Sequence, residues 1–162
     1  MSLAVCDILT AERVGVGSDA SRPVRSKAEV LTRLAELLSH GAEGVSAPDV
    51  ERVLAEREGL QSTGVGSGIA IPHGSSDAFP RLVAAVLLCP RPIPFEAIDH
   101  EPVSIFFSVI GPRHSTGDHL KALARISRLL RDEGLRERLL HASTGAEAYG
   151  LLAAAEGRPA AV

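Results

Sequence analysis

Two long, predominantly apolar segments do most to limit the folds open to this chain. They are residues 82–89 (LVAAVLLC) and 103–110 (VSIFFSVI). Each is about as long as a strand, and neither alternates polar and apolar residues as a strand with one solvated face does. They therefore predict two strands at the centre of a sheet that is covered on both faces.

Helix signals lie on both sides of this predicted sheet. Ser26 and Glu29 form a capping-box pattern, and Pro48 stands in the first turn of a second apolar-periodic segment. Leucine and isoleucine recur at helical spacing after the sheet. The helices are expected at residues 26–40, 46–59, 120–130, 135–140 and 146–155. Further strands are expected in the apolar start of residues 1–24, which then become a polar loop, and at residues 68–73.

The order of elements is helices, then clustered strands, then helices. It predicts an α/β fold, specifically a three-layer α/β/α sandwich with a central mixed β-sheet flanked by helices. A chain of 162 residues is long enough to bury one core without metals or disulfides. Residues 1–156 are predicted to form a single domain and residues 157–162 a short C-terminal tail.

Charge and hydropathy exclude several classes of partner. The formal net charge of −3 leaves no positive surplus for nucleic acid or an anionic membrane surface. The apolar segments are far shorter than the roughly 20 residues that cross a bilayer, and no signal peptide is recognisable. We expect a cytoplasmic protein with no nucleic-acid partner and no membrane insertion. Cys6 and Cys89 form neither a disulfide framework nor a metal-ligand pair.

The chain holds six histidines but only four phenylalanines, one tyrosine and no tryptophan. This composition favours proton or phosphoryl chemistry over stacking on nucleobases. His73 ends the predicted strand, follows Pro72 and precedes Gly74, which leaves one side of it open. His119 falls on the inward face of its predicted helix, in a first turn whose free N–H groups favour an anion. The alternative for His73 is a histidine that only bonds to neighbouring backbone at a sheet edge, and the alternative for His119 is a core histidine without a chemical role. The others are interpreted as structural or surface residues: His40, His100, His114 and His141.

Glycines cluster in residues 62–68 (STGVGSG), which match no dinucleotide fingerprint, phosphate loop or nucleophile elbow. A tight turn that leads into a strand is therefore the favoured interpretation. No residues have metal-ligand spacing, so neither a metal nor another cofactor is expected. A hydrolase in which His73 acts with Ser75 or Asp77 is less favoured, because residues so close in sequence do not form a triad by themselves.

Three separated blocks of the sequence resemble one known family. The first runs from Arg57 to Gly74 and includes Ser-Thr-Gly-Val-Gly-x-Gly-Ile-Ala-Ile-Pro-His. The second, Pro-Ile-x-Phe-x-Ala-Ile-Asp-x-x-Pro-Val, leads into the apolar segment 103–110, and the third begins at Asp118 with Asp-His-Leu. Together they resemble the type-2 enzyme IIA domains, of fructose, mannitol and nitrogen-related type, of the bacterial phosphotransferase system. The likeness spans residues 3–156.

The resemblance implies a catalytic site and a partner. It implies that His73 accepts a phosphoryl group, through its outer ring nitrogen, from a phosphohistidine on the phosphocarrier HPr or its nitrogen-branch counterpart. It also implies that His119 assists and that Arg57 contacts the phosphoryl group. The chain would then be a phosphotransferase with a phosphohistidine intermediate. After Gly74 the chain has Ser-Ser-Asp where relatives often have a basic residue, which leaves partner preference open.

Two physiological functions are compatible with this resemblance. No IIB cysteine motif is found in the sequence, so a stand-alone IIA protein is expected. That format favours a nitrogen-regulatory IIA whose phosphorylation state controls target proteins. The alternative is a fructose- or mannitol-type IIA component that passes the phosphoryl group to the cysteine of a IIB domain for sugar uptake.

Overall fold

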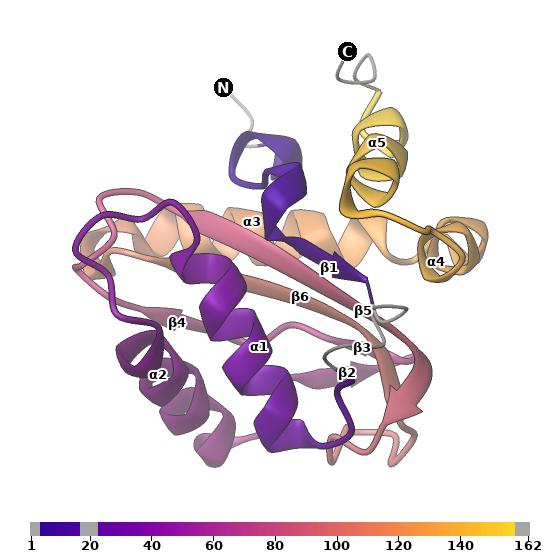
Figure 1. The fold of residues 1–162 in the computed structure, drawn as a ribbon, viewed down its shortest axis with the longest axis horizontal. Coiled ribbons are helices and arrows are strands. Elements are labelled where there is room, and N and C mark those ends of the chain that lie inside the picture. Colours follow the sequence, from indigo (N-terminus) through magenta and orange to yellow (C-terminus); the bar gives the residue numbers. More distant parts are fainter. Residues whose placement is uncertain (1–3, 17–22, 158–162) are drawn as a thin grey trace.

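A computed structural model of the protein describes residues 4–16 and 23–157. In this part of the chain, six strands form one mixed sheet with helices on both faces (Figure 1), which confirms the predicted α/β sandwich. The sheet order is β1-β5-β6-β3-β2, and β4 also pairs with β6. The strands are β1 (Val14–Val16), β2 (Gly64–Gly66), β3 (Ile69–Ala70), β4 (His73–Ser75), β5 (Val83–Ile93) and β6 (Val103–Gly111).

The helices lie close to where periodicity and capping residues predict them. Ser26 accepts a hydrogen bond from the Glu29 backbone N–H, as its capping pattern indicates, and Thr144 caps the last helix in the same way. The α-helices are α1 (Lys27–Ser39), α2 (Ala47–Leu60), α3 (Thr116–Leu129), α4 (Glu133–Leu140) and α5 (Gly145–Ala155). The short 3₁₀ turns are η1 (Val5–Asp7), η2 (Ala11–Arg13) and η3 (Arg113–Ser115). No helix in the described ranges is long and apolar enough to cross a membrane.

The two long central strands separate two hydrophobic clusters. Along β6, Phe106 packs in the cluster beneath α1 and α2, whereas Phe107 packs in the cluster beneath α3, α4 and α5. Both rings are fully buried. Burial of such a side chain contributes about 1.5–3 kcal/mol, so an apolar residue is favoured at every position of a strand covered on both faces. This is the physical origin of the predominantly apolar segment 103–110.

The prediction of a strand at the very start of the chain is wrong. The apolar residues there form the 3₁₀ turn η1, and the first strand is β1. The backbone N–H groups of Val5 and Cys6 donate to the carboxylate of Glu156 instead of to a neighbouring strand. Part of the predicted loop in residues 1–24, and residues 158–162 of the predicted tail, lie outside the described residues.

The strand predicted at 68–73 is two strands, and His73 begins the second instead of ending the first. The break falls at Pro72, which has no N–H to donate to a sheet. Its carbonyl oxygen nevertheless accepts from the Val109 backbone N–H (3.2 Å) and from Ser108 Oγ (2.7 Å). The chain is therefore anchored to β6 immediately before the histidine.

Two smaller differences concern the ends of elements. Strand β5 continues to Ile93, past the predicted end at residue 89, with a register shift between Leu88 and Ile93 that accommodates the prolines. Leu120, the first residue of the helix predicted at 120–130, belongs by spacing to the apolar stripe of that helix, but 64% of it is exposed. The inward stripe of α3 consists of His119, Ala122 and Ile126.

Candidate functional site

The parallel pairing of β4 with β6 decides which way His73 points. His73 lies opposite Val109, whose side chain packs on the α3 side of the sheet, and Gly74 lies opposite Ile110, which packs on the α2 side. Neighbouring residues of a strand point to opposite faces, so His73 faces α3 and Gly74 faces α2. A Cβ on Gly74 would lie 2.5 Å from Val53 Cγ1 of α2. The missing side chain thus lets α2 lie directly against the strand that carries the histidine.

The ring of His73 is held in one tautomer by the backbone. Its Nδ1 lies 2.7 Å from the Ile71 carbonyl oxygen, and a carbonyl can only accept, so Nδ1 carries the proton. The pKa of His73 is lowered, first by burial and then by the positive charges of Arg57 and His119, against the opposing effects of the Ile71 carbonyl and Glu58. A neutral ring with its lone pair on Nε2 is therefore favoured.

His119 is buried in the first turn of α3, with 8% of its surface exposed. Its Nε2 donates to the Pro112 carbonyl oxygen at 3.2 Å, so a neutral His119 has its lone pair on Nδ1. A Cβ on Gly111, at the end of β6, would lie 2.5 Å from Leu82 Cδ2 and 3.4 Å from that Nε2, so the glycine makes room chiefly for Leu82 and only touches the ring. The N–H of a neutral His119 ring is thus already bonded to the backbone.

Arg57 comes from the last turn of α2. Its Nη1 donates to the Gln61 carbonyl oxygen at 2.9 Å, which ties the side chain to the end of its own helix. A guanidinium has five N–H donors, so this bond leaves others free to bind an oxyanion. Arg57 is also close enough to His73 for its charge to lower the pKa of that ring.

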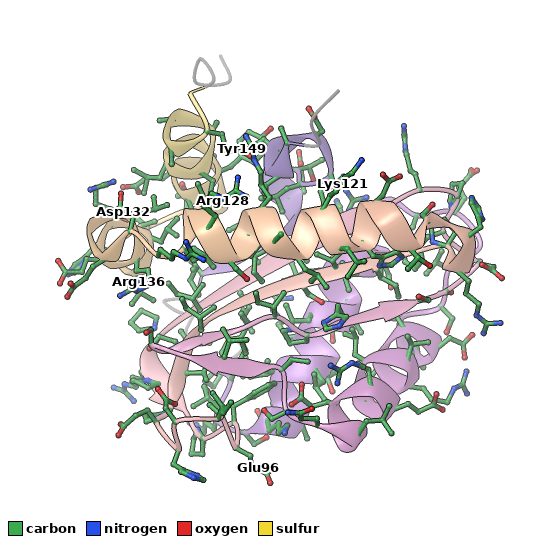
Figure 2. All side chains as sticks on the ribbon, turned by 180° about the vertical axis from the view of Figure 1, so that it is seen from behind. Glu96, Lys121, Arg128, Asp132, Arg136 and Tyr149 are labelled. Atoms are coloured by element: carbon green, nitrogen blue, oxygen red, sulfur yellow. The ribbon has the colours of Figure 1, made fainter. Side chains whose placement is uncertain are left out.

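The three predicted residues meet at one open hollow of about 580 Å³. The hollow lies between α2 and α3 at β4, and His73, Arg57 and His119 all line it. Two leucines with large exposed surfaces flank them, Leu60 (83% exposed) and Leu120 (64% exposed). Figure 2, a view from behind, shows α3 along the sheet with Lys121 and Arg128 on its outer side. The hollow thus brings the ring of His73 together with two basic side chains at a partly apolar surface.

The family model for the phosphoenolpyruvate-dependent sugar phosphotransferase system, EIIA 2, matches residues 8–155. The chain belongs to this family. Its membership confirms the resemblance of the three sequence blocks and supports phosphoryl transfer as its general chemistry.

Individual relatives of this IIA protein include nitrogen regulatory proteins, which agree with the nitrogen-related interpretation, and a fructose-specific component. A nitrogen regulatory protein of Bradyrhizobium diazoefficiens is 42% identical over 133 residues, which are 80% of this chain and 84% of that protein. The crystal structure of the nitrogen regulatory protein IIA-Ntr of Neisseria meningitidis superimposes with a TM-score of 0.81 at 30% identity, covering 91% and 98% of the two chains. A fructose-specific EIIA component of Haloferax volcanii is 39% identical over 100 residues, which are 62% of this chain and 65% of that protein.

The glycine-rich segment of this IIA protein is a turn, as its sequence favours. Gly66, Ser67 and Gly68 all have positive φ and connect β2 to β3. The segment does not line the hollow beside His73. Nor does the structure assemble the hydrolase alternative, because Asp77 Oδ1 accepts from the Arg113 backbone N–H and, among the described residues, His73 bonds to neither Asp77 nor Ser75. No group of His, Cys, Asp and Glu residues in the described ranges is arranged to hold a metal.

Sequence reasoning missed the polar residues behind the site, chiefly Ser108 and Glu58. Ser108 is fully buried and interrupts the apolar segment 103–110, a signal that the hydroxyl serves the backbone. Glu58 follows Val50 and Leu54 at helical spacing and is 5% exposed, so a charged residue occupies the apolar stripe of α2. Both signals are present in the sequence, but only the structure identifies their bonding partners.

Proposed function

We propose that this IIA protein is a cytoplasmic phosphoryl carrier that receives its phosphoryl group on Nε2 of His73 from a phosphohistidine of an HPr-like protein. The observation that carries the proposal is the 2.7 Å bond from Nδ1 to the Ile71 carbonyl. It leaves the lone pair on Nε2, in a ring that lines the same hollow as Arg57 and His119. Among the described residues, no hydrogen bond occupies Nε2.

The transfer requires no proton at the attacking nitrogen. The lone pair of Nε2 attacks phosphorus, the P–N bond of the donor breaks, and its electron pair returns to the imidazole of the donor. The proton on Nδ1 of His73 stays in place against the Ile71 carbonyl. The transition state is loose, with charge spread over the phosphoryl oxygens, so catalysis consists mainly of positioning and charge stabilisation.

Arg57 and His119 supply that stabilisation in the proposal. The free N–H donors of Arg57 suit a phosphoryl group because a planar guanidinium binds two oxygens at once. His119, whose Nε2 is bonded to Pro112, donates from Nδ1 when its ring carries a second proton. The exposed Leu60 and Leu120 form an apolar rim that a docked carrier covers, which excludes water from the P–N bond.

The physiological output proposed is nitrogen-related regulation, in which the phosphorylation state of His73 controls target proteins. It is supported by relatives named nitrogen regulatory protein, whose lengths this chain largely covers. The fructose- or mannitol-type function stays a second candidate because a fructose-specific EIIA component is also similar. In a solved complex from Escherichia coli, a mannitol IIA of the same fold is bound to phosphorylated IIB.

One experiment tests the chemistry. The protein is incubated with phosphoenolpyruvate, enzyme I and a cognate HPr-like carrier, and the phosphorylated residue is mapped by mass spectrometry under conditions that preserve P–N bonds. The wild type is expected to carry the group on His73, and His73→Ala to carry none. His40→Ala, which removes an exposed histidine at the end of α1, is expected to match the wild type. A phosphoryl group on another residue, or on the His73→Ala variant, contradicts the proposal.

A second experiment distinguishes the two outputs. The phosphorylated protein is mixed with the IIB proteins of the source organism, and transfer to their cysteines is followed. Transfer at a rate comparable to that from the carrier supports the sugar-uptake function. Retention of the group on His73 supports the regulatory function.

A further inference from the structure

A buried carboxylate lies directly behind the proposed phosphoryl site. Glu58, next to Arg57 in α2, is 5% exposed. Its Oε1 and Oε2 accept from the Thr63 backbone N–H at 3.1 and 2.9 Å, and Oε1 also accepts from Thr63 Oγ1. Lys27 Nζ, from the start of α1, lies 3.1 Å from Oε2. The carboxylate thus joins α1, the end of α2 and the segment that leads into β2.

From Thr63 the hydrogen bonds continue to His73. The Ile71 backbone N–H donates to the Thr63 carbonyl oxygen at 3.0 Å, and Nδ1 of His73 donates to the Ile71 carbonyl oxygen at 2.7 Å. Three consecutive links therefore connect the carboxylate of Glu58 to the ring. None of the intermediate atoms belongs to a helix, so the position of this backbone depends on the groups that bind it.

We propose that Glu58 is a positioning residue for phosphoryl transfer. Through Thr63 and Ile71 it fixes the carbonyl that holds the proton on Nδ1 of His73, which keeps Nε2 unprotonated and in the hollow. This inference rests on the proposed function, because it assigns Glu58 a part in the same reaction. Glu58 touches neither the phosphoryl group nor Nε2.

The chemistry of the site favours this role over a purely packing one. A buried carboxylate is costly unless several donors bind it, and an apolar side chain at position 58 would extend the stripe of Val50 and Leu54. A carboxylate instead binds the N–H and the hydroxyl of one residue at the same time, which fixes that residue in both position and orientation. Thr63 itself is 5% exposed and has no freedom to turn towards solvent.

Glu58 also acts on His73 through space. The charged groups that shift the His73 pKa are Arg57 and Glu58 from α2 and His119 from α3; Glu56 of α2 also lines the hollow. Of these, Glu58 raises the pKa, whereas Arg57 and His119 lower it. Removal of the Glu58 charge therefore moves the protonation of His73 to lower pH, an effect that a general loosening of the fold does not produce.

The test compares Glu58→Gln with two matched carboxylate variants. Glu96→Gln removes the exposed carboxylate that also pairs with Lys27 at 3.4 Å, and Glu156→Gln alters a buried carboxylate that binds the backbone at Val5 and Cys6. The readouts are the rate of phosphoryl transfer from the carrier, its pH profile, and the tautomer of His73 from the nitrogen chemical shifts of the ring. Thr63→Val and Thr63→Ser remove and restore the hydroxyl without a change of charge.

Glu58→Gln is expected to slow transfer about 10- to 100-fold, because small displacements of a reacting group have effects of this size. It is also expected to increase the Nε2–H tautomer and shift the acid limb of the pH profile to lower pH. Thr63→Val should slow transfer, whereas Thr63→Ser, which keeps the hydroxyl, and Glu96→Gln should transfer at the wild-type rate.

A wild-type rate and a wild-type tautomer in Glu58→Gln would overturn the inference. So would an equal slowing of transfer in Glu58→Gln and Glu156→Gln with the His73 tautomer unchanged in both. If the proposed function itself fails, the wild type is not phosphorylated on His73. The tautomer of His73 is measured without phosphate, so it tests the part of Glu58 independently of that outcome.

Discussion

The start of strand β4 and the start of helix α3 each present a histidine to the same hollow, but the backbone holds opposite nitrogens of the two rings. His73 donates from Nδ1 to the carbonyl of Ile71, two residues earlier in its own chain segment. His119 donates from Nε2 to the carbonyl of Pro112, which precedes its helix. The free nitrogen is therefore Nε2 in His73 and Nδ1 in His119.

This difference assigns the two rings different chemistry. His73 is partly exposed and its pKa is lowered, so its free nitrogen is an available lone pair, as a nucleophile requires. His119 is buried at a helix N-terminus, where anions are favoured, and in the proposed reaction its Nδ1 is the nitrogen left to bind a phosphoryl oxygen. Which nitrogen the backbone occupies matters as much as the presence of the two histidines.

The largest expected effect, after loss of His73 itself, comes from His119→Gln. The glutamine Nε2 reproduces the bond to the Pro112 carbonyl, but the side chain has no counterpart of Nδ1. Loss of one preorganised donor to developing charge costs about 10²- to 10³-fold in rate, so we expect transfer to His73 to slow to that extent. Single-turnover transfer from the phosphorylated carrier measures it, and urea unfolding is expected to change little because the backbone bond is kept.

The matched variant is His119→Ala, which loses both nitrogens and is expected to be slower in transfer and less stable. If His119→Gln transfers at the wild-type rate, the ring serves only to anchor Pro112. The two histidines then share no chemistry.

How far the sequence predicts this site can be judged from the same two histidines. The apolar segments and the α-helices follow from periodicity and capping, and the resemblance of three blocks picks out His73, His119 and Arg57. The tautomers do not follow, because they depend on carbonyls placed by tertiary structure. Ser108 reaches Pro72 across 36 residues of sequence, and no local pattern encodes that contact.

Dependence on residues distant in sequence also explains why the strands predicted at the N-terminus and around Pro72 are wrong. The residues of η1 have the apolar composition of a strand, but their N–H groups bind Glu156, which lies about 150 residues away in sequence. A proline next to a predicted strand end indicates a boundary, but not that a second strand resumes after it. At the N-terminus a distant partner decides whether a strand forms at all, and around Pro72 the pairing with β6 decides where the strands begin and end.

Glycines next to the two histidines provide a second way to test the comparison. Gly74→Ala places a Cβ 2.5 Å from Val53 Cγ1, so α2 or β4 must shift, and we expect a loss of about 1–3 kcal/mol in the free energy of unfolding. Since α2 carries Arg57, transfer to His73 should also slow. Urea denaturation measures the first effect and the transfer assay the second.

Gly117→Ala is the matched control at the helix. A Cβ there meets nothing within 4 Å, and its φ is not positive, so a gain of about 0.4–1 kcal/mol is expected. If Gly74→Ala and Gly117→Ala lose equal free energy of unfolding, the close contact between α2 and Gly74 does not explain the expected difference between the two positions.

The smallest expected effect is a dependence of stability on pH that belongs to His73. Its folded-state pKa lies below the ordinary value of 6.5, chiefly through burial, so the unfolded chain binds a proton more readily than the folded one. The associated stability is fully present above pH 6.5 and is lost as the pH falls from there through the folded-state pKa. His73→Asn keeps an N–H donor for the Ile71 carbonyl but does not titrate. Urea midpoints at pH 7.5 and 5.5 should therefore differ more for the wild type than for this variant, and an equal or smaller difference in the wild type would show that burial does not hold His73 neutral.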